Sequence, residues 1–136
     1  KYDKAQELYQ KGKYSRVKED LQYIIVSNPG SKMALESQFL LGESYFKLGE
    51  FELAAIELDK YARFSENYNK IEIARFRICE AAIKLSNSFQ KDQASSLEAL
   101  NRLQEFIEDY PESKQVLKAS GAISNENSMN FTFVDF

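Results

Sequence analysis

The chain of 136 residues contains no histidine, no tryptophan and one cysteine, Cys79. A single thiol cannot form an internal disulfide, and without histidine it has no ligand set for a structural zinc ion and no base for a reactive thiol. Proline occurs twice and glycine five times, which leaves long stretches free to form helices. These shortages exclude a disulfide framework and a zinc-binding fold, and they favour an all-α protein.

Long apolar runs and clusters of basic residues are also missing. No run approaches the roughly 18 to 20 apolar residues that cross a bilayer, and no signal peptide pattern is present. The formal net charge is -3 and no Lys/Arg cluster occurs, which argues against a nucleic acid as the main partner. Because the chain starts at Lys1 without a methionine, we interpret it as a processed or trimmed piece.

The most informative feature that the chain does have is an internal repeat of 37 residues. Equivalent positions keep both size and polarity, and each apolar set within a repeat follows the period of a helix. Such a repeat predicts stacked helical hairpins, in which function comes from the surface that the stacked units present. The aligned columns include Tyr2, Phe39 and Phe76; Ala5, Gly42 and Cys79; and Tyr9, Phe46 and Ile83.

Glycine, proline and serine mark the ends of the predicted helices. Gly12 and Gly49 are expected to end helices, and Ser31 is expected to be an N-cap. Ala54 and its counterpart Ala99 are 45 residues apart, so an eight-residue insertion is predicted inside the third hairpin. The predicted helices cover residues 1–11, 14–26, 32–47, 51–64, 70–85 and 94–109.

Two regions are predicted. Residues 1–119 form the helical-repeat domain, with about three repeats. Residues 120–136 form a polar linker and an extended, non-helical carboxy-terminal tail, because 129–136 is aromatic and β-prone without a helical period. The tail is interpreted as a non-native or displaced segment, with a tethered ligand mimic as the alternative.

The second repeat resembles the tetratricopeptide pattern, in which a small residue on the first helix lets the second helix approach closely. The residues that carry this resemblance are Leu41-Gly42, Tyr45, Gly49, Phe51, Ala54 and Leu58. The 37-residue period, the segment Tyr110-Pro111-Glu112-Ser113 and the segment Lys91-Asp92-Gln93 are similar to the BamD-like lipoproteins of the outer-membrane β-barrel assembly machinery. The resemblance covers about residues 1–119, which would be the amino-terminal half of the five repeats usual in that family.

This resemblance implies a periplasmic protein, held at the outer membrane by a lipid on an amino-terminal cysteine. The chain shows no such cysteine, since Cys79 lies within a predicted helix. The implied partners are a BamA-like barrel-forming subunit and unfolded outer-membrane proteins, which the amino-terminal repeats would capture and pass on. A periplasmic adaptor resembling the TolA-binding coordinator of the cell envelope is the alternative. The insertion before Asp92-Gln93 weighs against it.

In a tetratricopeptide array the first helices line the concave side, so we predict a peptide-binding groove there. Large rings beside carboxylates suit an extended or helical peptide with aromatic side chains. The alternative for Phe39, Phe46 and Phe76 is packing between neighbouring helices. No enzymatic activity, cofactor or metal site is predicted, Cys79 is assigned to the core and Asp92 to a helix N-cap. The predicted groove residues are Tyr2, Gln6, Tyr9, Phe39, Glu43, Phe46, Phe76, Glu80 and Ile83.

Overall fold

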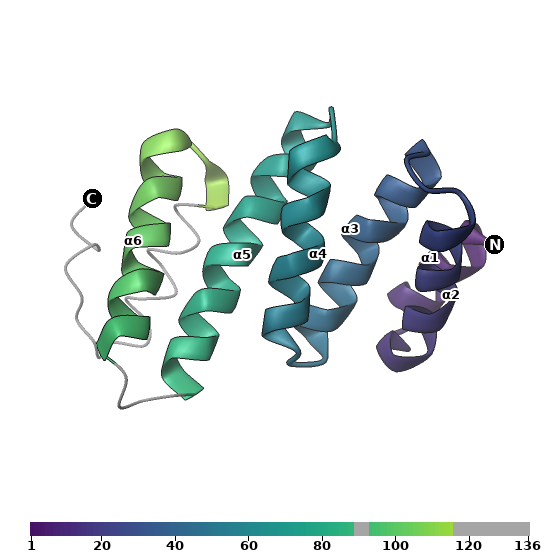
Figure 1. Ribbon diagram of the computed structural model, residues 1–136, viewed down its shortest axis with the longest axis horizontal. Helices are drawn as coiled ribbons and strands as arrows, with labels where there is room; N and C mark the ends of the chain where they lie inside the picture. The colour runs from purple at the N-terminus through teal and green to yellow at the C-terminus, as the bar shows by residue number, and fades with distance from the viewer. Residues whose placement is uncertain (89–92, 116–136) are drawn as a thin grey trace.

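The computed structural model describes residues 1–88 and 93–115, and within these ranges the chain is helical without any strand (Figure 1). The observed helix bounds lie within a few residues of the predicted ones. The helices are α1 (Tyr2–Gln10), α2 (Tyr14–Ser27), α3 (Lys32–Lys47), α4 (Phe51–Phe64), α5 (Tyr68–Ser88) and α6 (Gln93–Asp109).

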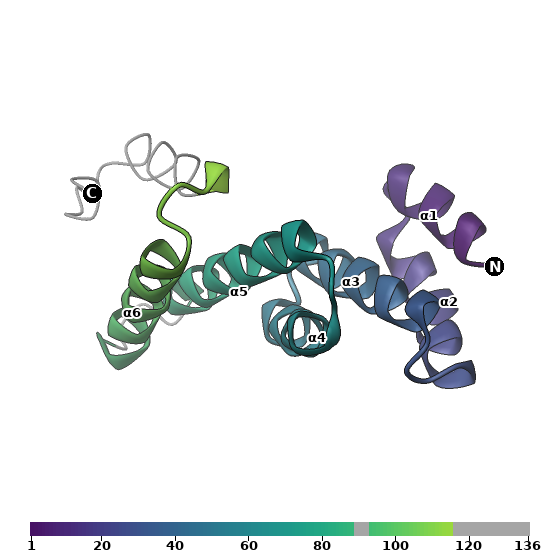
Figure 2. The same ribbon diagram turned by 90° about the horizontal axis from the view of Figure 1, so that it is seen from above.

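Consecutive helices pair as antiparallel hairpins, α1 with α2, α3 with α4 and α5 with α6. Each helix packs against the next along the chain, so α2 joins the first hairpin to the second and α4 joins the second to the third. Figure 2 shows that α1 and α4 lie on opposite sides of α3. The predicted all-α, tetratricopeptide-type solenoid of helical hairpins is confirmed for the described residues.

The tight turns between paired helices depend on glycine. Gly12 and Gly49 have φ angles of 79° and 81°, a left-handed conformation that glycine adopts without a steric cost. The residue after each glycine donates its backbone amide to a carbonyl in the last turn of the helix that has just ended. Lys13 N donates to Leu8 O at 3.0 Å, and Glu50 N donates to Tyr45 O at 2.9 Å. The same end structure therefore recurs one repeat later.

The turn between the first two hairpins is fixed by a serine cap. Ser31 has an extended backbone, and its hydroxyl oxygen accepts a hydrogen bond from the Ala34 amide at 3.0 Å. This is the predicted N-cap. Ser113, which follows the second proline of the chain, accepts from the Gln115 amide at 2.9 Å in the same manner.

One glycine is required by close packing rather than by its backbone angle. A Cβ atom at Gly42 of α3 would lie 2.5 Å from Cγ of Leu58 on α4. Leu58 is fully buried, so it has no room to withdraw. The equivalent positions in the other hairpins, Ala5 and Cys79, are small and buried as well. The aligned column Ala5, Gly42 and Cys79 therefore marks where the two helices of a hairpin approach most closely.

The insertion in the third hairpin lengthens its helices. Lys47 ends α3, and its counterpart is Lys84, but α5 continues one turn further to Ser88. Similarly, Phe51 begins α4 and its counterpart is Ser96, but α6 begins three residues earlier at Gln93. The predictions for Asp92 and for the tail lie outside the described residues.

Candidate functional site

The first aromatic column joins the two helices of each hairpin. The ring centroids of Phe39 and Tyr61 are 5.0 Å apart, and those of their counterparts Phe76 and Phe106 are 5.4 Å apart. Phe76 is only 3% exposed and belongs to the core between α5 and α6. Phe76 therefore packs against the partner helix of its own hairpin, whereas Tyr2 and Phe39 of the same column are half-buried.

The second column lies near the glycine turns and also makes equivalent contacts one repeat apart. Tyr9 meets Tyr14 edge to face at 5.2 Å, and Phe46 meets Phe51 in the same way at 5.1 Å. Tyr9 and Phe46 are nevertheless half-buried rather than buried. Ile83, the third member, is half-buried against the α5–α6 core.

Polar side chains of α1, α3 and α5 follow one another in two rows, and ion pairs join the α3 and α5 members of each row. Along each row successive residues are 34 positions apart, which is three less than the repeat. Three residues are close to one helical turn. Each residue of a row therefore lies about one turn before the position that the 37-residue repeat would make equivalent to the preceding residue of that row. We call the surface that carries both rows the first-helix face. The rows are Tyr2, Glu36 and Lys70, and Tyr9, Glu43 and Arg77.

Arg77 on α5 is the centre of the second row. Its Nε and Nη2 donate to the two carboxylate oxygens of Glu43 on α3, at 2.6 and 3.1 Å, and Nη1 donates to Glu80 at 2.6 Å. The guanidinium carbon also lies 5.0 Å from the ring centroid of Phe46. Burial lowers the pKa of Arg77, but hydrogen bonds and charge from Glu43 and Glu80 outweigh burial and raise it overall.

Lys70 has the equivalent place in the first row. Its ammonium pairs with Glu36 on α3 at 2.5 Å and lies 5.2 Å from the ring centroid of Phe39. Lys70 and Arg77 are seven residues apart on α5, as Glu36 and Glu43 are on α3. The two rows therefore repeat the same arrangement, a cation on α5 that pairs with a carboxylate on α3 and covers an aromatic ring.

The tyrosines that begin the rows are held neutral. Partial burial raises the pKa of Tyr2 to about 12, and the charge of Glu36 adds to this effect, whereas a hydrogen bond with the exposed Gln6 opposes it. Partial burial also raises the pKa of Tyr9 to about 12, with a further contribution from Glu43. Both hydroxyls therefore remain hydrogen-bond donors at neutral pH.

Sequence reasoning missed Glu36, Lys70 and Arg77. The 37-residue alignment identifies equivalent positions, whereas contacts between hairpins follow a spacing of 34. Opposite charges at that spacing, Glu36 with Lys70 and Glu43 with Arg77, were the available signal. Reading the sequence for charge pairs at the repeat length minus one helical turn would have found both.

The two glutamates of the predicted groove and the single cysteine have structural roles here. Glu43 and Glu80 both accept hydrogen bonds from Arg77, and Glu43 is only 8% exposed. Cys79 is buried, and its thiol donates to the Arg102 carbonyl at 3.3 Å. Burial raises the pKa of the Cys79 thiol to about 12, so it stays protonated and unreactive at neutral pH. The assignment of Cys79 to the core is confirmed.

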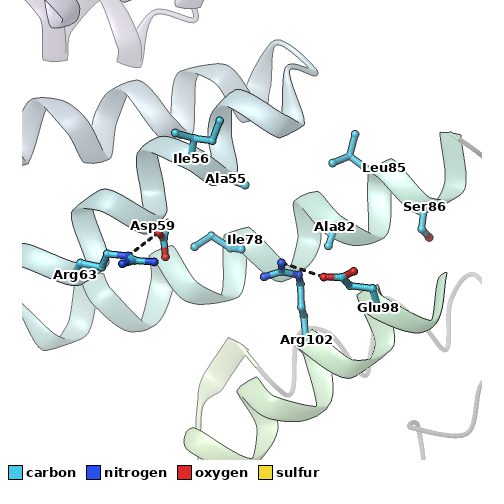
Figure 3. Close-up of a pocket in the computed structure, with 10 residues that line it drawn as sticks. All are labelled: Ala55, Ile56, Asp59, Arg63, Ile78, Ala82, Leu85, Ser86, Glu98 and Arg102. Atoms are coloured by element: carbon cyan, nitrogen blue, oxygen red, sulfur yellow. Dashed lines mark hydrogen bonds and ion pairs between the residues drawn. The ribbon is translucent and has the colours of Figure 1, made fainter. Parts of the chain in front are cut away.

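A hollow of about 480 Å³ lies apart from the first-helix face, between α4, α5 and α6. Figure 3 shows Ile78, Ala82 and Leu85 of α5 between side chains of the two flanking helices. Each flanking helix carries its own ion pair, Asp59 with Arg63 at 2.8 Å and Glu98 with Arg102 at 3.2 Å. None of the predicted groove residues lines this hollow.

The stacked hairpins, their glycine turns and the close approach at Gly42 define a helical-repeat protein of the tetratricopeptide type. Comparison with family models agrees with this class: the family described as YfiO, outer membrane lipoprotein, matches residues 1–128. The chain belongs to this family of outer membrane lipoproteins. No curated protein matches the chain closely enough to be assigned as a relative. Within the described ranges, no helix is both long and apolar enough to cross a membrane.

Proposed function

We propose that the first-helix face binds extended segments of unfolded outer-membrane barrel proteins, which the chain then passes to the barrel-forming subunit of the assembly machinery. Membership of an outer membrane lipoprotein family supports a role in outer-membrane assembly. The observation that carries the proposal is the pair of polar rows on α1, α3 and α5, in which ion pairs between α3 and α5 lie beside half-buried rings. In this proposal the chain binds its clients at the periplasmic face and catalyses no reaction.

The groups on this face match the needs of an unfolded chain. An extended segment has unpaired amides and carbonyls along both sides, and hydroxyl, amide and carboxylate groups can pair with them. Gln6 is exposed, while Tyr9 and Glu80 are half-buried, so each has surface left for a client. Phe46 is also half-buried and offers apolar area beside them.

The charge of the face indicates which segments it prefers. Its carboxylates are Glu36, Glu43 and Glu80, and its cations are Lys70 and Arg77, so one negative charge is left over. A neutral or basic aromatic segment therefore suits this surface better than an acidic one. The proposed surface keeps Tyr2, Gln6, Tyr9, Phe39, Glu43, Phe46, Glu80 and Ile83, and adds Glu36, Lys70 and Arg77.

Affinity for a labelled peptide tests this surface. We would measure fluorescence anisotropy with a peptide that copies one aromatic strand of an outer-membrane barrel. Phe46→Ala should weaken binding about tenfold, since central aromatic residues dominate such interfaces, while circular dichroism shows unchanged helix content. Phe64→Ala is the matched control, because this exposed ring at the end of α4 lies outside the proposed surface.

A second variant guards against loss of folding in Phe46→Ala. Gln6 is exposed, so Gln6→Arg should leave stability unchanged. It should nevertheless weaken binding, because a long cation would occupy the client's place and repel a basic peptide. Equal affinities for the parent, Phe46→Ala and Gln6→Arg would overturn the proposal.

The partners can be separated by co-purification from an envelope extract. Recovery of the barrel-forming subunit with the full chain is the result we expect. Recovery of a Tol component instead would favour the adaptor alternative, which the sequence left open. The family match supports the first partner, and no contact in the described residues favours the second.

A further inference from the structure

Large apolar side chains are exposed along one edge of the solenoid, where α2 meets α3 and α4 meets α5. Phe64 and Tyr68 are 70% and 80% exposed, and Val26 and Met33 are 76% and 49% exposed. All four lie within a few residues of a turn on the upper side of Figure 1. We call these four residues the turn edge.

The two turns form one continuous surface. A hollow of about 630 Å³ is lined by Gly30 and Lys32 from the first turn and by Phe64, Ser65 and Asn67 from the second. Side chains from turns that are more than 30 residues apart in sequence therefore face the same space. Of the turn edge, Phe64 lines this hollow, and Tyr68 begins the helix that follows the second turn.

At the opposite edge of the solenoid, the aromatic residues beside the turns are packed rather than exposed. There, Tyr14 and Phe51 are half-buried and pack edge to face against Tyr9 and Phe46. At the turn edge, Phe64 and Tyr68 occupy the last position of α4 and the first position of α5 and face solvent. Folding of the described hairpins gains little from these rings, so both rings are available to contact a surface outside the chain.

We propose that the turn edge rests on the phospholipid surface of the membrane to which this family of lipoproteins is attached. Phe and Tyr are suited to the boundary between headgroups and acyl chains, because a ring can enter the apolar layer while a hydroxyl stays hydrated. Charge at this edge does not favour anionic lipids, since one cation, Lys32, lines the hollow together with the carboxylates Glu36 and Glu66. Insertion of apolar side chains, rather than attraction to anionic lipids, therefore provides the contact.

A lipid-attached protein makes this contact effective. One acyl chain alone gives only marginal binding, and stable attachment takes a second contact. An anchor keeps the protein near the bilayer, so even a weak protein contact is formed most of the time. The contact would fix the solenoid's orientation, with Glu36 at the boundary between the turn edge and the first-helix face. This inference rests on the family's location at the outer membrane and not on peptide binding.

Introduced tryptophans can test the contact, because the chain has neither tryptophan nor histidine of its own. The vesicles would contain phosphatidylethanolamine, phosphatidylglycerol and a nickel-chelating lipid. An amino-terminal histidine tag on the full chain would bind the nickel, and this attachment would replace the lipid anchor. Tyr68→Trp reports from the turn edge. Leu97→Trp is the matched control, since Leu97 is 60% exposed near the start of α6 at the opposite edge.

We expect the emission of Tyr68→Trp to shift to the blue on the vesicles and to be quenched by brominated acyl chains, whereas Leu97→Trp shows neither change. In the untagged protein, Phe64→Ser with Tyr68→Ser should lower the vesicle partition coefficient about tenfold. The control pair Leu53→Ser with Ile56→Ser, exposed at the start of α4, should leave it unchanged.

Two outcomes would overturn the inference. Equal emission with and without vesicles for Tyr68→Trp would show that the turn edge does not meet lipid. A blue shift that depends on protein concentration in the absence of vesicles would instead assign this edge to contact between copies of the chain. Unchanged peptide affinity in Phe46→Ala and Gln6→Arg would overturn the proposed function and leave the vesicle result unaffected, so the two proposals can fail separately.

Discussion

Arg77 on α5 binds Glu43 on α3 in a two-pronged contact, with Nε to Oε1 at 2.6 Å and Nη2 to Oε2 at 3.1 Å. Both side chains are largely shielded from water, and the pair joins the second hairpin to the third. A planar guanidinium fits a carboxylate in this way, whereas an ammonium cannot. The contact fixes the relative position of two helices of the first-helix face.

Removal of the Arg77 side chain should therefore destabilise the fold. Arg77→Ala leaves the buried Glu43 carboxylate without this partner, and we expect a loss of about 2–3 kcal/mol in the free energy of unfolding. Arg77→Lys should lose less, because it keeps the charge. Urea unfolding followed by circular dichroism measures both. The control Arg63→Ala removes an exposed pair within α4 and should cost less than about 0.5 kcal/mol; equal losses at positions 63 and 77 would contradict the account.

Packing at Gly42 gives a second prediction. Gly42→Ala places a Cβ against the buried Leu58, and overpacking of this kind costs about 1–3 kcal/mol. In a double-mutant cycle, Leu58→Ala should reduce that penalty, since it empties the space. Gly49→Asn is the control, because asparagine tolerates the left-handed φ of 81° and nothing lies within 4 Å of the new Cβ. Additive effects at positions 42 and 58 would show that the two residues do not touch.

The tyrosines of the two rows predict a late ionisation step. Tyr2 and Tyr9 have pKa values raised to about 12 from 10, so between pH 10 and 12 the unfolded chain loses these protons before the folded chain does. Stability should therefore be unaffected below pH 10 and fall as the pH rises toward 12. Absorbance at the tyrosinate band follows the titration. Tyr9→Phe should remove part of the late step, whereas loss of amplitude near pH 10 instead would place Tyr9 in water.

The buried thiol provides a probe of the third hairpin. Burial raises the pKa of Cys79 to about 12, so the native protein should react slowly with a thiol reagent at pH 8, and reaction should accelerate strongly in urea. Because the folded pKa is raised above its usual 9, this group's contribution to stability is lost as the pH increases from 9 to 12. Fast labelling of the native protein would mean that α5 and α6 separate readily.

The fold could be predicted from the sequence because the residues that end or begin its helices act locally. Gly12, Gly49 and Ser31 each set a helix end through their own backbone or side chain, and the structure repeats these devices. The site could be predicted only in part. Phe76 was expected in the groove and packs in the α5–α6 core, since a repeat alignment shows which positions are equivalent and does not show which way they face. Arg77 was missed because its partner lies on another hairpin, at a spacing of 34 residues rather than the repeat length of 37.

Site-specific photo-crosslinking tests the central claim most directly. A photoreactive phenylalanine analogue at Tyr9 would report from the first-helix face, and the same analogue at Tyr23, exposed on α2, would serve as the control. On addition of an unfolded outer-membrane barrel protein, the account predicts a crosslink from position 9 and none from position 23. Equal crosslinking from both positions, or crosslinking from position 23 alone, would contradict the claim that the first-helix face receives the client.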